Sequence, residues 1–237
     1  EWKALNSSYK FGYEKTPVIT FEKATLVCYA KNDTSTVFDT KGTLLPLKET
    51  FRGKGGKVTW ERANLPANET WADLNNYEIT LRSTGFDADS VLFHTPYFKT
   101  PLSGKLLEKI TPQPKTRAAT YPQFQSYSKR LFIKNIFPNV DYDGGFSMQG
   151  ASLMGFGTIG EEAQIYLYRK DKRFMRIHSL SFTIKKDVVD SDRAGAVIYI
   201  AQDSISHPYL RFKYQQKDNQ VILSRNKDGL SQSPFFN

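Results

Sequence analysis

Residues 164–169 read Gln-Ile-Tyr-Leu-Tyr-Arg, and this short stretch decides the fold class. Ile165 and Leu167 alternate with Tyr166 and Tyr168, so an extended chain here has one aliphatic and one aromatic face. Alternation with a period of two, in β-branched and aromatic residues, is typical of a half-buried β-strand. The stretch therefore predicts a strand and not a helix.

The same alternation recurs along the chain from Phe146 onward. Polar or glycine-containing segments at 143–145, 171–172, 217–219 and 228–229 separate the candidate strands and supply turn-forming residues. A spacing of about 8 to 14 residues leaves no room for crossover helices, so it predicts antiparallel pairing. The other alternating positions are Leu180, Phe182, Ile184, Ile198, Ile200, Leu210, Phe212, Tyr214, Val221 and Leu223.

The first half of the chain shows the same pattern less regularly. Its candidate strands are 18–21, 24–30, 57–60, 77–82 and 90–93, and residues 103–110 are the best helix candidate, with Ser103 as the N-cap. We expect an all-β protein of antiparallel sandwich or jelly-roll-like sheets. A proline-containing connector at 111–127 separates a β lobe at 1–110 from another at 128–237, and the two lobes form either separate cores or one sandwich.

Charge and composition exclude several classes of protein. The chain has 33 basic and 24 acidic residues, a net charge of +9, but the basic residues lie beside acidic ones, as in 169–173, and this pattern argues against a nucleic-acid partner. The longest apolar run, 196–201, is far too short for a transmembrane segment. Cys28 is the single cysteine, so we expect no internal disulfide and no multi-cysteine zinc site.

Two glycine-rich stretches resemble phosphate-binding loops. Residues 155–160 match G-x-G-x-x-G, but the strand pattern at 164–169 follows where a dinucleotide fold needs a helix, so we expect a hairpin or bulge. Residues 53–57, Gly-Lys-Gly-Gly-Lys, lack the Walker spacing and predict a tight turn, with an anion-binding nest as the alternative.

The titratable residues offer no convergent catalytic set. His94, His178 and His207 are scattered, and we interpret them as surface or strand-end residues. Asp141 and Asp143 lie in an expected turn, where a sandwich-fold glycosidase would need two facing acids. We expect no cofactor. Asp187, Asp190 and Asp192 are interpreted as an acidic loop, and a structural calcium site with these three ligands is the alternative.

Aromatic residues are the most suggestive feature for binding. With 3 Trp, 13 Tyr and 17 Phe, some rings must be exposed, and flat aromatic faces bind sugar rings. Trp2, Trp60 and Trp71 are the candidate platforms for a glycan, and cross-strand packing is the alternative for Trp60 and Trp71.

Three further stretches, 41–47, 53–60 and 144–150, carry a family resemblance. With them the whole chain resembles an internal section of the large β-rich envelope proteins of Bacteroides-type bacteria. The resemblance implies export to the periplasm, outer membrane or cell surface, and neighbouring domains of a longer parent protein as partners. A start at Glu1, without Met or a signal peptide, also predicts a piece of a longer or processed protein.

These observations favour a non-enzymatic scaffold or binding module of an exported multidomain protein. The first alternative is a carbohydrate-binding module that uses the tryptophans. Two further alternatives are a sandwich-fold glycosidase and a β groove that carries lipid. In such a groove the inward side chains would be Ile165, Leu167, Phe182, Ile184, Ile198 and Ile200.

Overall fold

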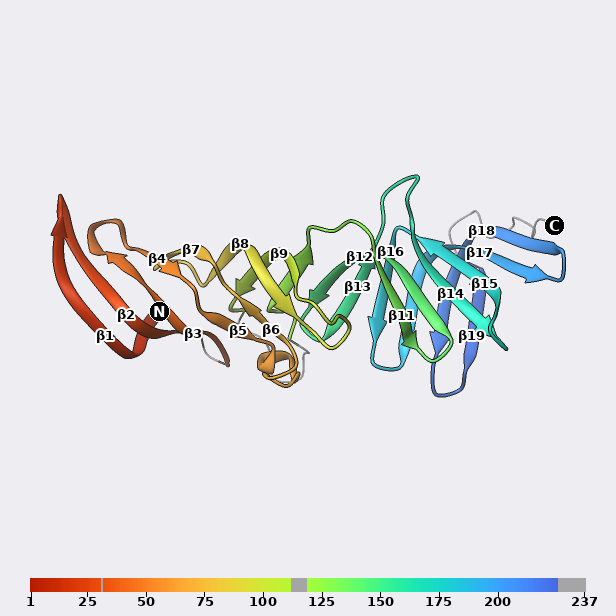
Figure 1. Ribbon diagram of the computed structural model, residues 1–237, viewed down its shortest axis with the longest axis horizontal. Helices are drawn as coiled ribbons and strands as arrows, with labels where there is room; N and C mark the ends of the chain where they lie inside the picture. The colour runs from red at the N-terminus through yellow and green to blue at the C-terminus, as the bar shows by residue number, and fades with distance from the viewer. Residues whose placement is uncertain (31, 112–118, 226–237) are drawn as a thin grey trace. The chain divides into compact units, whose positions relative to one another are not determined.

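The computed structural model describes residues 1–30, 32–111 and 119–225, and these divide into two compact units. Unit 1 comprises Glu1–Tyr127 with Met148–Ala151, and unit 2 comprises Ser128–Ser147 with the remaining residues from Ser152 onward. Strands dominate both units, and every described strand pairing is antiparallel (Figure 1). The all-β prediction is therefore confirmed, while the jelly-roll arrangement stays a prediction.

Unit 1 consists of two runs of paired strands that share β3. One run is β1, β2, β3, β4 and β7, and the other leaves β3 at Phe38 and continues through β5, β6, β8, β9 and β10. The elements are β1 (Trp2–Glu14), β2 (Thr16–Ala30), β3 (Asp33–Leu45), the 3-10 turn η1 (Pro46–Lys48), β4 (Thr50–Lys54), β5 (Lys57–Thr59), the 3-10 turn η2 (Glu61–Ala63), β6 (Trp71–Asp73), β7 (Asn76–Thr80), β8 (Gly85–His94), β9 (Leu102–Lys109) and β10 (Gln123–Ser126).

Unit 2 is a meander in which each strand pairs with a near neighbour in the chain. Its pairings run through β11, β12, β14, β15, β17, β18 and β19, while β16 pairs with β13 and β17. The elements are β11 (Leu131–Phe137), β12 (Val140–Gln149), β13 (Ser152–Phe156), β14 (Ala163–Arg169), β15 (Lys172–Ser179), β16 (Ser181–Lys185), β17 (Val188–Ile200), β18 (Asp203–Gln215) and β19 (Gln220–Arg225).

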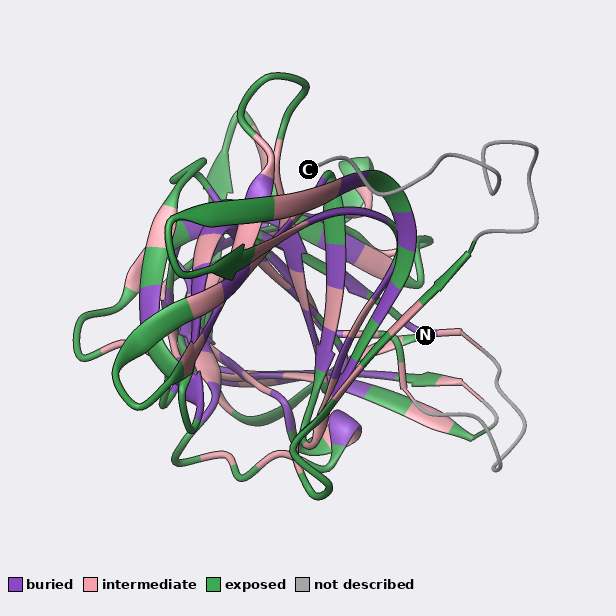
Figure 2. Cartoon of the chain, turned by 90° about the vertical axis from the view of Figure 1, so that its right-hand side faces the viewer, coloured by how far each residue is buried: buried purple, intermediate pink, exposed green. Residues whose placement is uncertain are grey.

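Each unit has its own aromatic core. In unit 1 the Trp60 ring lies 4.8 Å from that of Phe93, which stacks on Phe124 at 4.3 Å. In unit 2 the Phe182 ring makes edge contacts with Tyr142 and Phe212. Buried and exposed residues alternate along many strands, as the purple and green bands of Figure 2 show. Alternate burial of this kind places one face of each strand in the core.

Two predictions of local structure are wrong, and glycine is involved in both. Residues 103–110, expected as a helix, lie mostly in strand β9. Gly104 is buried in this strand, and the position requires glycine because the Phe124 ring occupies the space that a Cβ atom would need. Residues 143–145, expected as a turn, lie within β12, where the Phe156 ring fills the same space over Gly145. Both glycines serve close packing between neighbouring strands.

A cluster of three charged side chains lies in the interior of unit 1. Arg62 of η2 donates hydrogen bonds to Glu108 of β9 and, over 2.6 Å, to Asp33 of β3. Only 1% of the Glu108 side chain is exposed. Burial raises the pKa of the Glu108 carboxyl to about 7, although the adjacent Arg62 guanidinium favours its charged form. One guanidinium faces two carboxylates here, so a proton on the more buried acid balances the charge.

This cluster predicts that unit 1 becomes less stable as the pH rises from about 4.5 to about 7. The native state keeps a proton on Glu108 that the unfolded chain has already lost, so the free energy of unfolding falls by an amount on the order of 3 kcal/mol. Urea unfolding at a series of pH values measures it through tryptophan fluorescence, because Trp2, Trp60 and Trp71 all lie in unit 1. Glu108→Gln should flatten this dependence, and an unchanged slope in that variant would contradict the assignment.

Candidate binding surface

The three predicted tryptophan platforms are not flat exposed faces. Trp60 is completely buried in the core of unit 1, so no ligand can stack on it. The Trp71 ring is covered on both sides, since His94 from β8 stacks on it at 4.3 Å and Lys57 Nζ from β5 lies 4.3 Å from its centroid. Trp2 is half-buried, and its indole Nε1 donates a hydrogen bond to Ser83 O over 2.8 Å. Of the two interpretations, the glycan platform is wrong for Trp60 and Trp71. Trp60 packs against Phe93 in the core, and the ring of Trp71 is occupied by cross-strand contacts.

Two of the three candidate calcium ligands form ion pairs with basic side chains. Asp187 pairs with Lys217 at 3.3 Å and Asp192 pairs with Arg211 at 3.1 Å. Within the described residues, no group of three or more His, Cys, Asp or Glu side chains converges in a way that would hold a metal ion. Asp187, Asp190 and Asp192 therefore do not form the candidate calcium site.

The other predicted chemical groups are engaged in structural contacts. Asp141 accepts a hydrogen bond from Asn135 N over 2.8 Å, and Asp143 forms an ion pair with Arg130. His207, expected near the surface, is buried. Its Nδ1 atom accepts a hydrogen bond from the backbone of Tyr209. Cys28 is also fully buried, and burial raises the pKa of its thiol.

The lipid groove, one of the alternatives left open by the sequence, would need an open row of inward side chains in unit 2. Four of its six proposed inward side chains, Ile165, Leu167, Phe182 and Ile184, are buried in the core, and Ile200 is exposed. Because four of the six side chains are buried, they do not line an open trough. Among the described residues, no helix has the length and apolar character needed to cross a bilayer.

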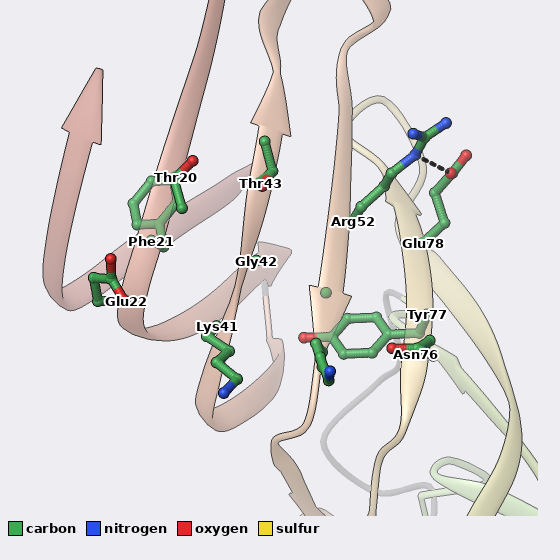
Figure 3. A pocket seen from close by; sticks show the side chains of 12 residues that line it. Thr20, Phe21, Glu22, Lys41, Gly42, Thr43, Arg52, Asn76, Tyr77 and Glu78 are labelled. Carbon is green, nitrogen blue, oxygen red and sulfur yellow. Dashed lines mark hydrogen bonds and ion pairs between the residues drawn. The ribbon is translucent and has the colours of Figure 1, made fainter. Parts of the chain in front are cut away.

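The glycine-rich turn at 53–57 lies beside an open hollow of about 690 Å³ over β2, β3, β4 and β7. The Tyr77 ring reaches across from β7 over Gly53 and fills the space of a missing side chain (Figure 3). The Tyr77 hydroxyl lies 2.6 Å from Thr40 Oγ1, and burial raises the pKa of Tyr77 to about 12. The Gly55 amide donates to Asn75 O over 2.7 Å, so it is not aimed at an anion. The prediction of a turn is confirmed. In the alternative, an anion-binding nest, the Gly55 N–H would have to bind the anion, and it is already bonded to Asn75 O.

A row of aromatic rings runs from the core of unit 1 onto the exposed hairpin of β1 and β2. Neighbouring ring centroids along it are 5.4 to 6.4 Å apart. The inner rings are buried, whereas Tyr9 is 53% and Phe11 77% exposed. Tyr13, also on β1, is 76% exposed. The row consists of Phe86, Tyr77, Phe51, Phe21, Tyr9 and Phe11.

A small apolar pocket of about 90 Å³ adjoins this row. Phe21 and Phe51 belong to both, so the pocket and the row form one continuous apolar surface. Lys3, on β1, is the only charged residue among those that line the pocket. The other lining residues are Trp2, Ala4, Leu26, Leu44, Ile79 and Leu81.

Sequence reasoning missed this surface although a signal was present. Tyr9, Phe11 and Tyr13 alternate with Lys10 and Gly12, which is the period of a strand with one aromatic face. The Tyr9 and Phe11 rings stand at 87° to each other, so they do not form the flat platform that a sugar chain needs. Exposed aromatic side chains in a contiguous patch mark an interaction site.

Comparison with protein-family models, with curated proteins and with solved structures found no match. The geometry of the described residues is therefore the basis for assigning a function.

Proposed function

We propose that this chain is a non-enzymatic binding module of an exported bacterial protein, and that it binds an alkyl chain on unit 1. The binding surface is the row of aromatic rings that ends on β1 and β2, together with the adjoining pocket. The observation that carries the proposal is the continuity of this surface, from buried Phe51 through shared Phe21 to exposed Tyr9 and Phe11. Its origin in an exported protein is supported by the resemblance of the sequence.

The size and lining of the pocket favour the end of an alkyl chain. A dry apolar cavity of about 150 Å³ accommodates a benzene molecule, so a pocket of about 90 Å³ suits a few methylene groups. Each buried CH₂ group contributes roughly 0.8 kcal/mol. The rest of the chain would lie against the exposed Tyr9 and Phe11 rings.

Quenching of tryptophan fluorescence by terminally brominated undecanoate tests this proposal. Trp2 lines the pocket, whereas Trp60 is buried and Trp71 is covered, so we expect saturable quenching that Trp2→Phe removes. Ala4→Phe should fill the pocket and weaken binding about tenfold, the equivalent of losing a few buried methylene groups.

Ser8→Phe is the matched control, because Ser8 is exposed on the same strand and does not line the pocket. It should bind undecanoate as the unmodified chain does. If the probe does not quench, or if the Ala4 and Ser8 variants behave alike, the alkyl chain does not occupy this pocket.

A further inference from the structure

Unit 2 contains a hollow of about 590 Å³ that the proposed function does not use. Ser179 and Ser191, whose hydroxyls form a hydrogen bond with each other, are among the residues that line it. The side chains that matter for the argument are Glu162, His178, Asp190, Arg193 and Tyr209. Pockets of this volume accommodate small organic ligands.

The floor of the pocket is a bulge in β17. This strand pairs with β16 up to Asp190 and with β15 from Ala194 onward, and its register against β18 shifts between Ser191 and Ala194. The hydroxyls of Ser179 and Ser191, both almost completely buried, lie 2.9 Å apart, and Ser179 Oγ donates to Arg193 O over 2.7 Å. Bulges re-aim side chains, and this one is fixed by buried hydrogen bonds.

Gly195 provides the space for the imidazole of the pocket. It pairs with His178 across the two strands, and a Cβ atom at Gly195 would lie 2.2 Å from His178 Nε2. The Nδ1 atom of His178 contacts the carboxylate of Glu162. The ring is therefore held on both sides, by backbone beneath it and by a carboxylate at its edge.

The glycine motif at 155–160 builds the wall that carries Glu162. Thr158 and Glu161 exchange two backbone hydrogen bonds of 3.0 Å, and Gly160 has a φ of +86°, so the motif is a tight hairpin, as the sequence predicts. Gly157 N donates to Leu180 O over 3.0 Å and fixes the hairpin against the pocket. The motif thus forms the hairpin that precedes Glu162 and positions this side chain at the pocket.

Acidic side chains outnumber basic ones in the pocket, although the whole chain has a net positive charge. Three carboxylates, from Glu162, Asp190 and Asp192, line it together with one guanidinium and one imidazole, in a chain of net charge +9. Within the described residues, no cation lies within ion-pair distance of Asp190. Such a lining disfavours an anionic ligand.

We propose that this pocket binds an uncharged mono- or disaccharide. The carboxylates of Asp190 and Glu162 would accept hydrogen bonds from sugar hydroxyls, and the guanidinium of Arg193 would donate them. The Arg193 guanidinium lies 5.6 Å from the centroid of the Tyr209 ring, so it covers one face of that ring. Tyr209 is still 41% exposed, and its other face would contact the C–H side of a sugar ring. This site lies in unit 2 and is independent of the alkyl surface of unit 1.

Calorimetric titration of the full chain with glucose, galactose, mannose, N-acetylglucosamine, cellobiose, maltose and lactose tests the proposal. We expect at least one of these sugars to bind. Asp190→Asn should then weaken binding by about tenfold, because a hydrogen bond to a charged acceptor is lost while the shape is kept. Gly195→Ala should also weaken it, by displacing His178.

The control is Asp203→Asn, an exposed aspartate of β18 that does not line the pocket, and it should leave sugar binding unchanged. Circular dichroism checks that each variant remains folded. Three results would overturn the proposal: no sugar in the panel binds, the Asp190 and Asp203 variants behave alike, or glucuronate or the hydroxyl-free diamine cadaverine binds more tightly than every neutral sugar.

Discussion

Replacement of Arg62 by methionine is expected to destabilise unit 1 by about 3–5 kcal/mol near pH 8, since it leaves two carboxylates without their cation. The side chains of Arg62 and Asp33 are about five-sixths buried, and Glu108 is almost completely buried. Asp33 also accepts a hydrogen bond from Thr111 N, so the cluster connects β3, η2 and the end of β9. At about pH 5 the cost should be smaller, because Glu108 then takes up a proton.

Urea unfolding followed by tryptophan fluorescence measures this cost. The matched control is Arg52→Met, whose partner Glu78 is more than half exposed, as is Arg52 itself. An exposed ion pair contributes about 0–1 kcal/mol, so the control should unfold nearly as the unmodified chain does. Equal costs for the two variants would mean that the Arg62 cluster is solvated and contributes no more than a surface pair.

Trp60→Ala is expected to cost about 3–5 kcal/mol, whereas Trp60→Phe should cost within about 1 kcal/mol. Alanine leaves a large cavity beside Phe93, whose ring contacts Trp60 at 4.8 Å. Phenylalanine keeps most of that contact and removes Nε1, an indole N–H that is buried without a hydrogen-bond partner in the described structure. Removal of the unpaired N–H should be stabilising, and this gain should offset part of the free-energy cost of the smaller cavity that phenylalanine leaves.

The same urea experiment reads both Trp60 variants, because Trp2 and Trp71 remain as probes of unit 1. A phenylalanine variant as unstable as the alanine variant would show that Nε1 makes a stabilising contact. A large loss of unfolding free energy in the alanine variant, with or without a similar loss in the phenylalanine variant, agrees with a core role for Trp60 and not with a glycan platform.

Strands with one apolar face could be predicted from the sequence, and strands with unusual inward residues could not. The alternation at 164–169 corresponds to β14, in which Ile165 and Leu167 are buried. In β9 the inward positions include Gly104 and Glu108, which look polar or flexible in the sequence. The core accommodates them because the Phe124 ring covers the glycine and Arg62 donates a hydrogen bond to the acid. Both partners are distant in the sequence.

The candidate sites depended on contacts that a single sequence does not contain. The number of aromatic residues predicted that some rings are exposed, but which rings are covered depends on strand register, as the pairing of Trp71 with His94 shows. The sequence left a calcium site as the alternative to an acidic loop near Asp187, because it does not show that Arg211 of β18 pairs with Asp192 and that Lys217 of the following turn pairs with Asp187. Strand β1 was missed although Tyr9, Phe11 and Tyr13 alternate with Lys10 and Gly12, and both of its faces are largely exposed.

The most direct measurement of the central claim is photolabelling with an alkyl carboxylate that carries a diazirine at the end of its chain. After irradiation, mass spectrometry of the digested full chain locates the labelled residues. We expect labels concentrated on Trp2, Phe21, Leu44 and Phe51 of the pocket, with weaker labels on Tyr9 and Phe11. Excess undecanoate should compete with this labelling. Labels scattered evenly over both units, or concentrated in unit 2, would contradict the claim.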